Sequence, residues 1–120
     1  MANTQLTKTY STTATSKKIL TVSAWVKRSK LGSVNEVFSA SRASDGYQTD
    51  IIRFGSSDQL EFFSFPSTGG TTSVKTNRLF RDTSAWYHIV VMVNTTDGTA
   101  ADRVRMYVNC LLYTSDAADE

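Results

Sequence analysis

Alternation of apolar and polar residues is the feature that most limits how this 120-residue chain can fold. Residues 19–27 read ILTVSAWVK, and every second side chain of this run is apolar and points the same way. These side chains are Leu20, Val22, Ala24 and Val26, opposite Thr21, Ser23 and Trp25. A period of two with β-branched residues is typical of a half-buried β-strand. The segment therefore predicts a strand with one face toward a core.

Six further segments are predicted to be strands: residues 34–41, 50–54, 59–65, 71–76, 86–94 and 103–109. Residues 50–54 and 59–65 are predicted to form a hairpin around the turn residues 55–58. The run WYHIVVMVN at 86–94 is apolar on both faces, which favours a central strand covered on both sides. No helical period extends far enough to predict a helix. Short strands separated by turns predict an all-β, antiparallel β-sandwich of the jelly-roll kind.

Composition excludes several classes of protein. Hydrophobic residues make up 40% of the chain and charged residues 20%, as in an ordinary soluble domain. A formal net charge of +2 does not predict a nucleic-acid partner, which needs a concentrated basic face. No apolar run is long enough to insert in a membrane, and the polar residues 1–18 show no signal peptide. We interpret residues 1–18 as a lead-in peptide or a first strand.

The last eleven residues, CLLYTSDAADE, differ in character from the rest. The first ten of them can be back-translated as TGT CTC TTA TAC ACA TCT GAC GCT GCC GAC, which resembles a transposase-type sequencing adapter. We therefore predict that residues 110–120 are foreign and that the domain is C-terminally incomplete after Asn109. A genuine polar tail is the alternative. Without the three acidic residues of this tail, thirteen basic residues would stand against eight acidic ones, a net charge of +5.

Three of the predicted strands resemble a known family. The segments LTVSAWVKRS, WYHIVVMVN and RVRMYVN, in this order, are similar to the AWV, WYH and YVNG strands of laminin-G-like domains. The resemblance spans residues 18–109 and implies a concanavalin A-like fold for them. The family pattern expects Gly after Asn109, because Asn-Gly suits a hairpin turn that needs positive φ. This chain has Cys110 there instead.

The segments SAWVKRSKLG and LFRDTSAWYHIVV are similar to segments in domains of phage structural and tail-associated proteins. This resemblance implies a non-catalytic binding module that recognises a carbohydrate or a host surface. It also implies a location in a virion or outside the cell, with other virion proteins as partners. A purely structural protein–protein module and an inactive glucanase remnant are the alternatives.

Catalysis is not predicted. Glucanases of the resembling fold need two carboxylates close together on one strand face. Asp58 and Glu61 are the nearest acids, but they flank a turn at the wrong spacing. No nucleophile elbow, phosphate loop or dinucleotide motif is present. The only histidine, His88, cannot form a conventional zinc site alone, and we predict that it is buried and hydrogen-bonded.

Aromatic side chains are the first candidates for ligand binding. Trp25, Trp86 and Tyr87 could stack on sugar rings, but their positions within strands favour packing in the core. Tyr47 and Phe65 lie beside predicted loops and are predicted ligand-binding residues.

Charged side chains supply the remaining candidates. Lys27, Arg28 and Lys30 follow the first strand and are predicted to contact a phosphate or an acidic glycan, with a solvated rim as the alternative. Modules of the laminin-G type can hold calcium through loop oxygens, and Asp45 and Asp97 are the predicted ligands if calcium is bound. Scattered loop acids are otherwise solvated turn residues. No other cofactor is expected.

Overall fold

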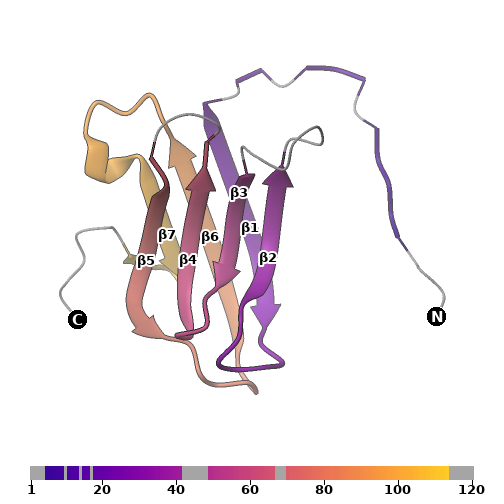
Figure 1. The fold of residues 1–120 in the computed structure, drawn as a ribbon, viewed down its shortest axis with the longest axis vertical. Helices are drawn as coiled ribbons and strands as arrows, with labels where there is room; N and C mark the ends of the chain where they lie inside the picture. Colours follow the sequence, from indigo (N-terminus) through magenta and orange to yellow (C-terminus); the bar gives the residue numbers. More distant parts are fainter. Residues whose placement is uncertain are drawn as a thin grey trace.

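The computed structural model describes residues 5–9, 11–13, 15–16, 18–41, 49–66 and 70–113. Within them the chain forms strands and one short 3-10 helix (Figure 1). The strands are β1 (Ile19–Lys27), β2 (Asn35–Ser41), β3 (Thr49–Phe54), β4 (Gln59–Phe65), β5 (Thr72–Leu79), β6 (Trp86–Asn94), β7 (Val104–Val108) and β8 (Leu111–Tyr113). The helix, η1, spans Ala100–Asp102. None of the described helical residues forms a helix long and apolar enough to cross a membrane.

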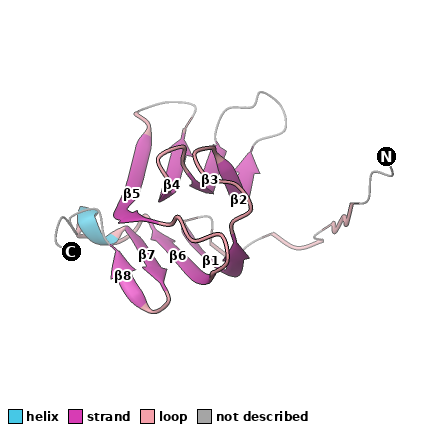
Figure 2. Cartoon of the chain, turned by 90° about the horizontal axis from the view of Figure 1, so that it is seen from below, coloured by secondary structure: helices cyan, strands magenta, loops and turns pink. Residues whose placement is uncertain are grey.

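The strands form two antiparallel four-stranded sheets that lie face to face (Figure 2). One has the order β1-β6-β7-β8 and the other the order β2-β3-β4-β5. The predicted all-β sandwich is therefore confirmed. The strands β1, β4 and β6 have the predicted bounds, and β5 continues three residues further than predicted, to Leu79. The strand β8 lies in the segment predicted to be foreign, and that origin stays a prediction.

The core lies between the two inner faces. Sheet β2-β3-β4-β5 contributes Ile52, Phe54, Leu60, Phe62 and Val74, the β5–β6 loop contributes Phe80, and sheet β1-β6-β7-β8 contributes Tyr87, Ile89, Val91, Val104, Met106 and Val108. In β6 burial alternates, so that Ile89 is buried whereas Trp86 and Met92 are exposed. The prediction that this strand is covered on both sides is wrong. The described residues leave the apolar outer face of β6 accessible to solvent.

The loops gather at two ends of the sandwich, for which we use two names. The locked end holds residues 28–34, 55–58 and 80–85, which join β1 to β2, β3 to β4 and β5 to β6. The open end holds the beginning of β1, the β6–β7 loop at 95–103, and the neighbouring ends of β3, β4 and β5 (Figure 1). Their side chains differ, as described below.

A two-residue turn joins β7 to β8. Val108 pairs with Leu111, and the residues between them, Asn109 and Cys110, have φ values of 48° and 69°. Two positive φ angles in succession are the geometry of a type I′ hairpin turn, for which Asn-Gly is the favoured pair. Asn tolerates this conformation, whereas a cysteine side chain is strained in it.

Candidate functional site

Arg28 is buried at the locked end and does not belong to an exposed basic cluster. Its side chain is 1% exposed. One guanidinium nitrogen, Nη1, donates to Asp58 Oδ1 at 2.9 Å and to the carbonyl of Phe80 at 2.7 Å. The other, Nη2, donates to the carbonyl of Lys30 and to Asn35 Oδ1, both at 3.2 Å. The predicted ligand contact of Arg28 is therefore corrected, because these donors are directed at the chain's own loops. Lys27 and Lys30 remain at the surface.

Asp58 is the centre of this network. Its Oδ1 accepts the backbone N–H of Gly32 at 2.9 Å, and its Oδ2 accepts Nε of Arg81 at 3.2 Å. The Gly32 hydrogen bond, together with those from Arg28 and Arg81, holds the pKa of Asp58 below its usual range despite the opposing effect of burial. One carboxylate thus ties together the three connections of the locked end.

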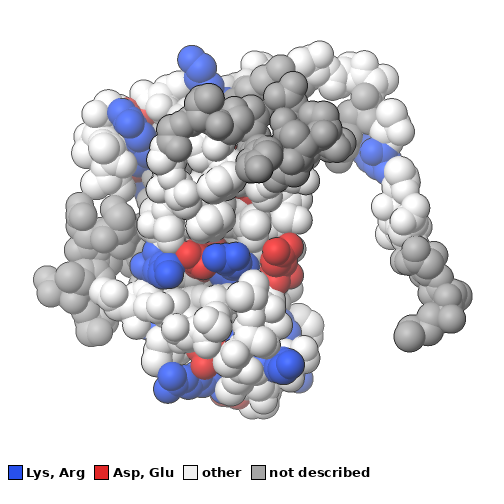
Figure 3. All heavy atoms as spheres, in the orientation of Figure 1, with Lys and Arg blue, Asp and Glu red and all other residues white. Residues whose placement is uncertain are grey.

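A row of alternating charges crosses the outer face of the β2-β3-β4-β5 sheet. The strand register places Glu36, Arg53, Glu61 and Lys75 side by side. Figure 3 shows this row as a band of blue and red across the face. Arg53 Nε lies 2.8 Å from Glu61 Oε2, and Lys75 Nζ lies 3.5 Å from Glu61 Oε1. Opposite charges on adjacent strands stabilise the pairing of a sheet.

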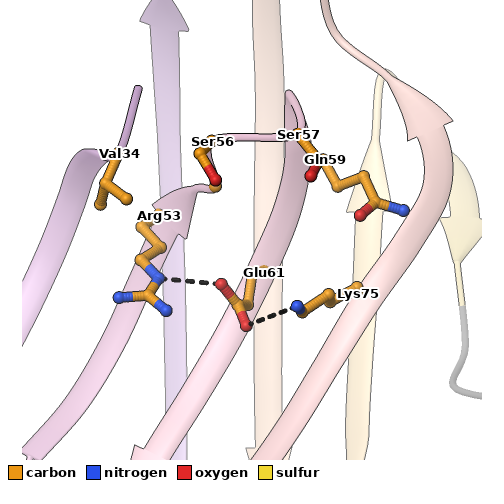
Figure 4. A pocket seen from close by; sticks show the side chains of 8 residues that line it. Val34, Arg53, Ser56, Ser57, Gln59, Glu61 and Lys75 are labelled. Atoms are coloured by element: carbon orange, nitrogen blue, oxygen red, sulfur yellow. Dashed lines mark hydrogen bonds and ion pairs between the residues drawn. The ribbon is translucent and has the colours of Figure 1, made fainter. Parts of the chain in front are cut away.

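A small pocket of about 120 Å³ opens beside Glu61 (Figure 4). The carboxylate, 5% exposed, also accepts the Ser73 hydroxyl at 2.7 Å. Desolvation raises the pKa of Glu61, but the bonds from Arg53 and Ser73 and the nearby charge of Lys75 outweigh it and leave the pKa lowered. Such a carboxylate is poorly suited to donate a proton. The side chains of Glu61 and Asp58 share no hydrogen-bond partner among the described residues.

Only one of the two predicted calcium ligands, Asp97, lies in the described part of the chain. Asp45 and the predicted ligand-binding residue Tyr47 lie outside the described residues. Asp97 accepts the backbone N–H of Thr99 at 2.9 Å, and its second oxygen lies 4.0 Å from Nη2 of Arg105. Within the described ranges, no three His, Cys, Asp or Glu residues cluster closely enough to hold a metal. Calcium therefore stays a prediction.

Phe65, the other aromatic candidate, ends β4. Its side chain is exposed. The register pairs it with Thr49 on β3, away from the core residue Phe62 on the same strand. Phe65 thus lies at the open end, whereas Lys27 and Lys30 lie at the locked end of the sandwich.

Two exposed tryptophans form the most distinctive surface feature. Trp25 is 65% exposed and Trp86 is 59% exposed, so the prediction that both pack in the core is wrong. Tyr87, between the two outward-facing residues of β6, is buried as predicted. The register of β1 with β6 places Trp25 opposite His88 and Lys27 opposite Trp86. We call these four outward-facing residues the tryptophan platform.

His88 is held firmly within the platform. Its ring stacks on the Trp25 indole with a centroid separation of 5.0 Å and an interplanar angle of 30°. Its Nε2 lies 3.0 Å from the Ser23 hydroxyl, and its backbone N–H donates to Asn109 Oδ1 at 2.9 Å. The prediction of a hydrogen-bonded histidine is confirmed, although the side chain is only partly buried. These contacts fix the orientation of Trp25.

The sequence contained a signal for the platform. Trp25 falls on the polar side of the alternating β1 pattern, opposite the side that carries Val26. Position within a strand does not by itself predict burial, because successive side chains of a strand point to opposite faces. Lys27 was predicted as a ligand-binding residue, and the structure places it in the platform without Arg28.

The apolar surface continues beyond the platform across the same sheet. Val90 pairs with Ser23 and with Tyr107, which in turn pairs with Leu112. Met92 and Leu112 are exposed. Exposed apolar residues in such continuity are typical of a contact surface.

The comparisons with known proteins agree with this architecture. The laminin-G-type family model described as the concanavalin A-like lectin/glucanases superfamily matches residues 2–119. No curated protein and no solved structure matches the chain significantly. The two antiparallel sheets and the family match together show that the chain belongs to the concanavalin A-like lectin/glucanases superfamily, as a laminin-G-type domain.

Proposed function

We propose that this chain is a non-catalytic recognition module that binds carbohydrate through the tryptophan platform. Membership of a lectin-like family indicates a binding module in general. The observation that carries the finer proposal is the exposure of Trp25 and Trp86 on one sheet face. Large planar side chains placed in solvent offer apolar faces, and pyranose rings have an apolar face of matching size.

The polar members of the platform favour a sugar over a purely apolar ligand. Lys27 and His88 occupy the diagonal opposite to the two tryptophans. An ammonium group and an imidazole can bind hydroxyls, and the ammonium can also bind a carboxylate or sulfate. The platform therefore suits an acidic glycan as well as a neutral one.

The platform is also preorganised. Its four residues project from paired strands, and the His88 contacts restrain Trp25 before a ligand arrives. A rigid site loses less conformational entropy on binding than a loop that must order. This supports recognition by a sheet face in addition to the loop recognition predicted from the sequence.

A structural protein–protein module is the second candidate, and a different observation favours it. The apolar surface extends along β6 from the platform to the exposed Met92. Protein interfaces are enriched in exposed Trp, Tyr and Met. Under this alternative, changes at Met92 would matter as much as changes at Trp25.

The two candidates can be separated by screening the chain against host-surface glycans, with and without calcium, as wild type and as Trp25→Ala and Trp86→Ala. We expect saturable binding that each tryptophan change weakens about tenfold or more, equivalent to ~1.4 kcal/mol. Met92→Ala is the matched control, an exposed apolar residue of the same sheet outside the platform. Loss of binding by all three variants would favour a protein-contact surface. Absence of any glycan binding would refute the carbohydrate proposal.

We further propose that the domain belongs to a phage structural or tail-associated protein and that residues 110–120 derive from adapter sequence. The segments SAWVKRSKLG and LFRDTSAWYHIVV, and the strained turn residue Cys110, support these two proposals. Amplifying the source locus on both sides of codon 110 tests both. A glycine codon after Asn109 with capsid or tail genes nearby would support them. An encoded CLLYTSDAADE followed by a stop codon would contradict the second.

A further inference from the structure

A cavity of about 360 Å³ lies between the two sheets at the open end, apart from the tryptophan platform. Side chains from both inner faces line it, together with residues of the rim. Its two walls differ sharply in chemistry. The difference determines which ligand the cavity can accept.

One wall is a polar row at positions that belong to the core face. Asp50 pairs with Ser64, and Ser64 pairs with Thr72. All three lie two residues from the buried row of Ile52, Phe62 and Val74, so the sheet pleat directs them inward as well. Inner faces of sandwiches are normally apolar, and polar residues at such positions usually serve a function.

The facing wall is apolar, with a basic rim. Leu20 pairs with Val93, and Val93 pairs with Val104, on the inner face of the other sheet. Lys18 and Arg103 border the cavity beside this wall. Arg103 uses its Nε to bind the carbonyl of Asp97 at 2.9 Å, which holds the guanidinium at the rim.

The charges therefore lie on opposite sides. The Asp50 carboxylate makes no hydrogen bond or ion pair with another residue in the described part of the chain. Lys18 and Arg103 line the same cavity and immediately precede β1 and β7, strands of the other sheet. Packed sheets are about 10 Å apart, a span that a short extended ligand can bridge.

We propose that this cavity binds a small zwitterion of the amino-acid class, with an ammonium group and a carboxylate at the ends of a short apolar body. Asp50, with the Ser64 and Thr72 hydroxyls, receives the ammonium group. Lys18 and Arg103 receive the carboxylate. The apolar body packs on Leu20, Val93 and Val104.

Calorimetric titration of the full chain with 6-aminohexanoate tests this assignment, with hexylamine and hexanoate as probes that each lack one charge. We expect 6-aminohexanoate to bind and each single-charge probe to bind about tenfold or more weakly. Asp50→Asn, and separately the double change Lys18→Gln with Arg103→Gln, should each weaken binding by a similar factor. Glu36→Gln, an exposed acid on the outer face of a sheet, is the control and should leave binding unchanged. Trp25→Ala should also leave it unchanged.

A second measurement keeps the proposal testable if Asp50→Asn fails to fold. Amide chemical shifts of the wild type are recorded during the same titration. We expect the largest changes at Ser64, Thr72 and Val93. Equal binding of hexylamine and 6-aminohexanoate, shifts confined to other parts of the sheets, or no binding at about 10 mM ligand would each overturn the assignment. Loss of thermal stability by Asp50→Asn and Lys18→Gln to the same extent, without zwitterion binding, would show an internal ion pair instead.

Discussion

Replacing Arg28 with alanine removes the buried cation of the locked end. The guanidinium donates four hydrogen bonds, to Asp58, Phe80, Lys30 and Asn35, and it is almost wholly shielded from water. The variant leaves the Asp58 carboxylate without its closest cation and leaves backbone and amide oxygens without donors. Apart from Asn35, the first residue of β2, these groups lie in loops that the arginine holds together.

The cost follows from comparable buried pairs. Removing one partner of a buried ion pair destabilises a protein by about 3–5 kcal/mol. The free energy of unfolding of a domain is about 5–15 kcal/mol in total, so Arg28→Ala would remove a large fraction of it. Arg28→Lys keeps the charge but cannot reproduce the planar fork, and its loss should lie between that of alanine and zero.

Arg81→Gln is the matched control for this prediction. Arg81 pairs with the same Asp58 carboxylate at 3.2 Å, but its side chain is 63% exposed. Exposed ion pairs contribute about 0–1 kcal/mol. Urea unfolding monitored by circular dichroism gives the free energy of unfolding for each variant. If Arg28→Ala lost no more stability than Arg81→Gln, the argument that burial sets the cost would be wrong.

Three further predictions concern the sheets. Glu61 has a lowered pKa in the folded chain, so its stabilising contribution is present above its ordinary pKa and is lost as the pH falls below about 4.5. Glu61→Gln should therefore reduce the loss of stability between about pH 5 and 3, as measured by urea unfolding at several pH values. Cys110→Gly should raise the free energy of unfolding by up to about 1 kcal/mol, because glycine adopts positive φ without strain. Asn109→Gly should not raise it, because the Asn109 side chain accepts a backbone hydrogen bond that glycine would lose. Ile89→Ala in the core should cost about 2–5 kcal/mol, whereas Trp86→Ala on the same strand should cost less than about 1 kcal/mol; similar losses in thermal unfolding would contradict the assigned faces.

The sequence predicted the strands well because local pattern determines them. The β1 alternation placed the residues from Leu20 to Val26 on the correct faces of the strand. The weaker β2 pattern also gave a strand, although its pairing with β3 is irregular between Glu36 and Phe38. Successive side chains of a strand point to opposite faces, so the period of two in the sequence reappears as alternating burial in the folded sheet.

The environment of individual side chains was less predictable, because distant segments determine it. Arg28 and Asp58 are thirty positions apart, and only the folded chain brings them together. Asp58 also adopts a φ of 64°, which allows its carboxylate to reach the β1–β2 loop. Nothing in the local sequence distinguishes this aspartate from a solvated turn residue.

The core itself determines where the tryptophan platform lies. A slip of β6 by one residue against β1 would turn Trp86 and His88 inward and expose Ile89, which is fully buried. Because burial of Ile89 and its neighbours opposes that slip, the tryptophans need no stabilising role of their own to remain aligned. Changes at Trp25 should then alter binding with little effect on stability, whereas changes at Ile89 should weaken both. Separate effects on binding and on stability would show that the exposed tryptophans serve contact with a partner. They would not then be exposed merely because too few polar residues are present to cover the sheet.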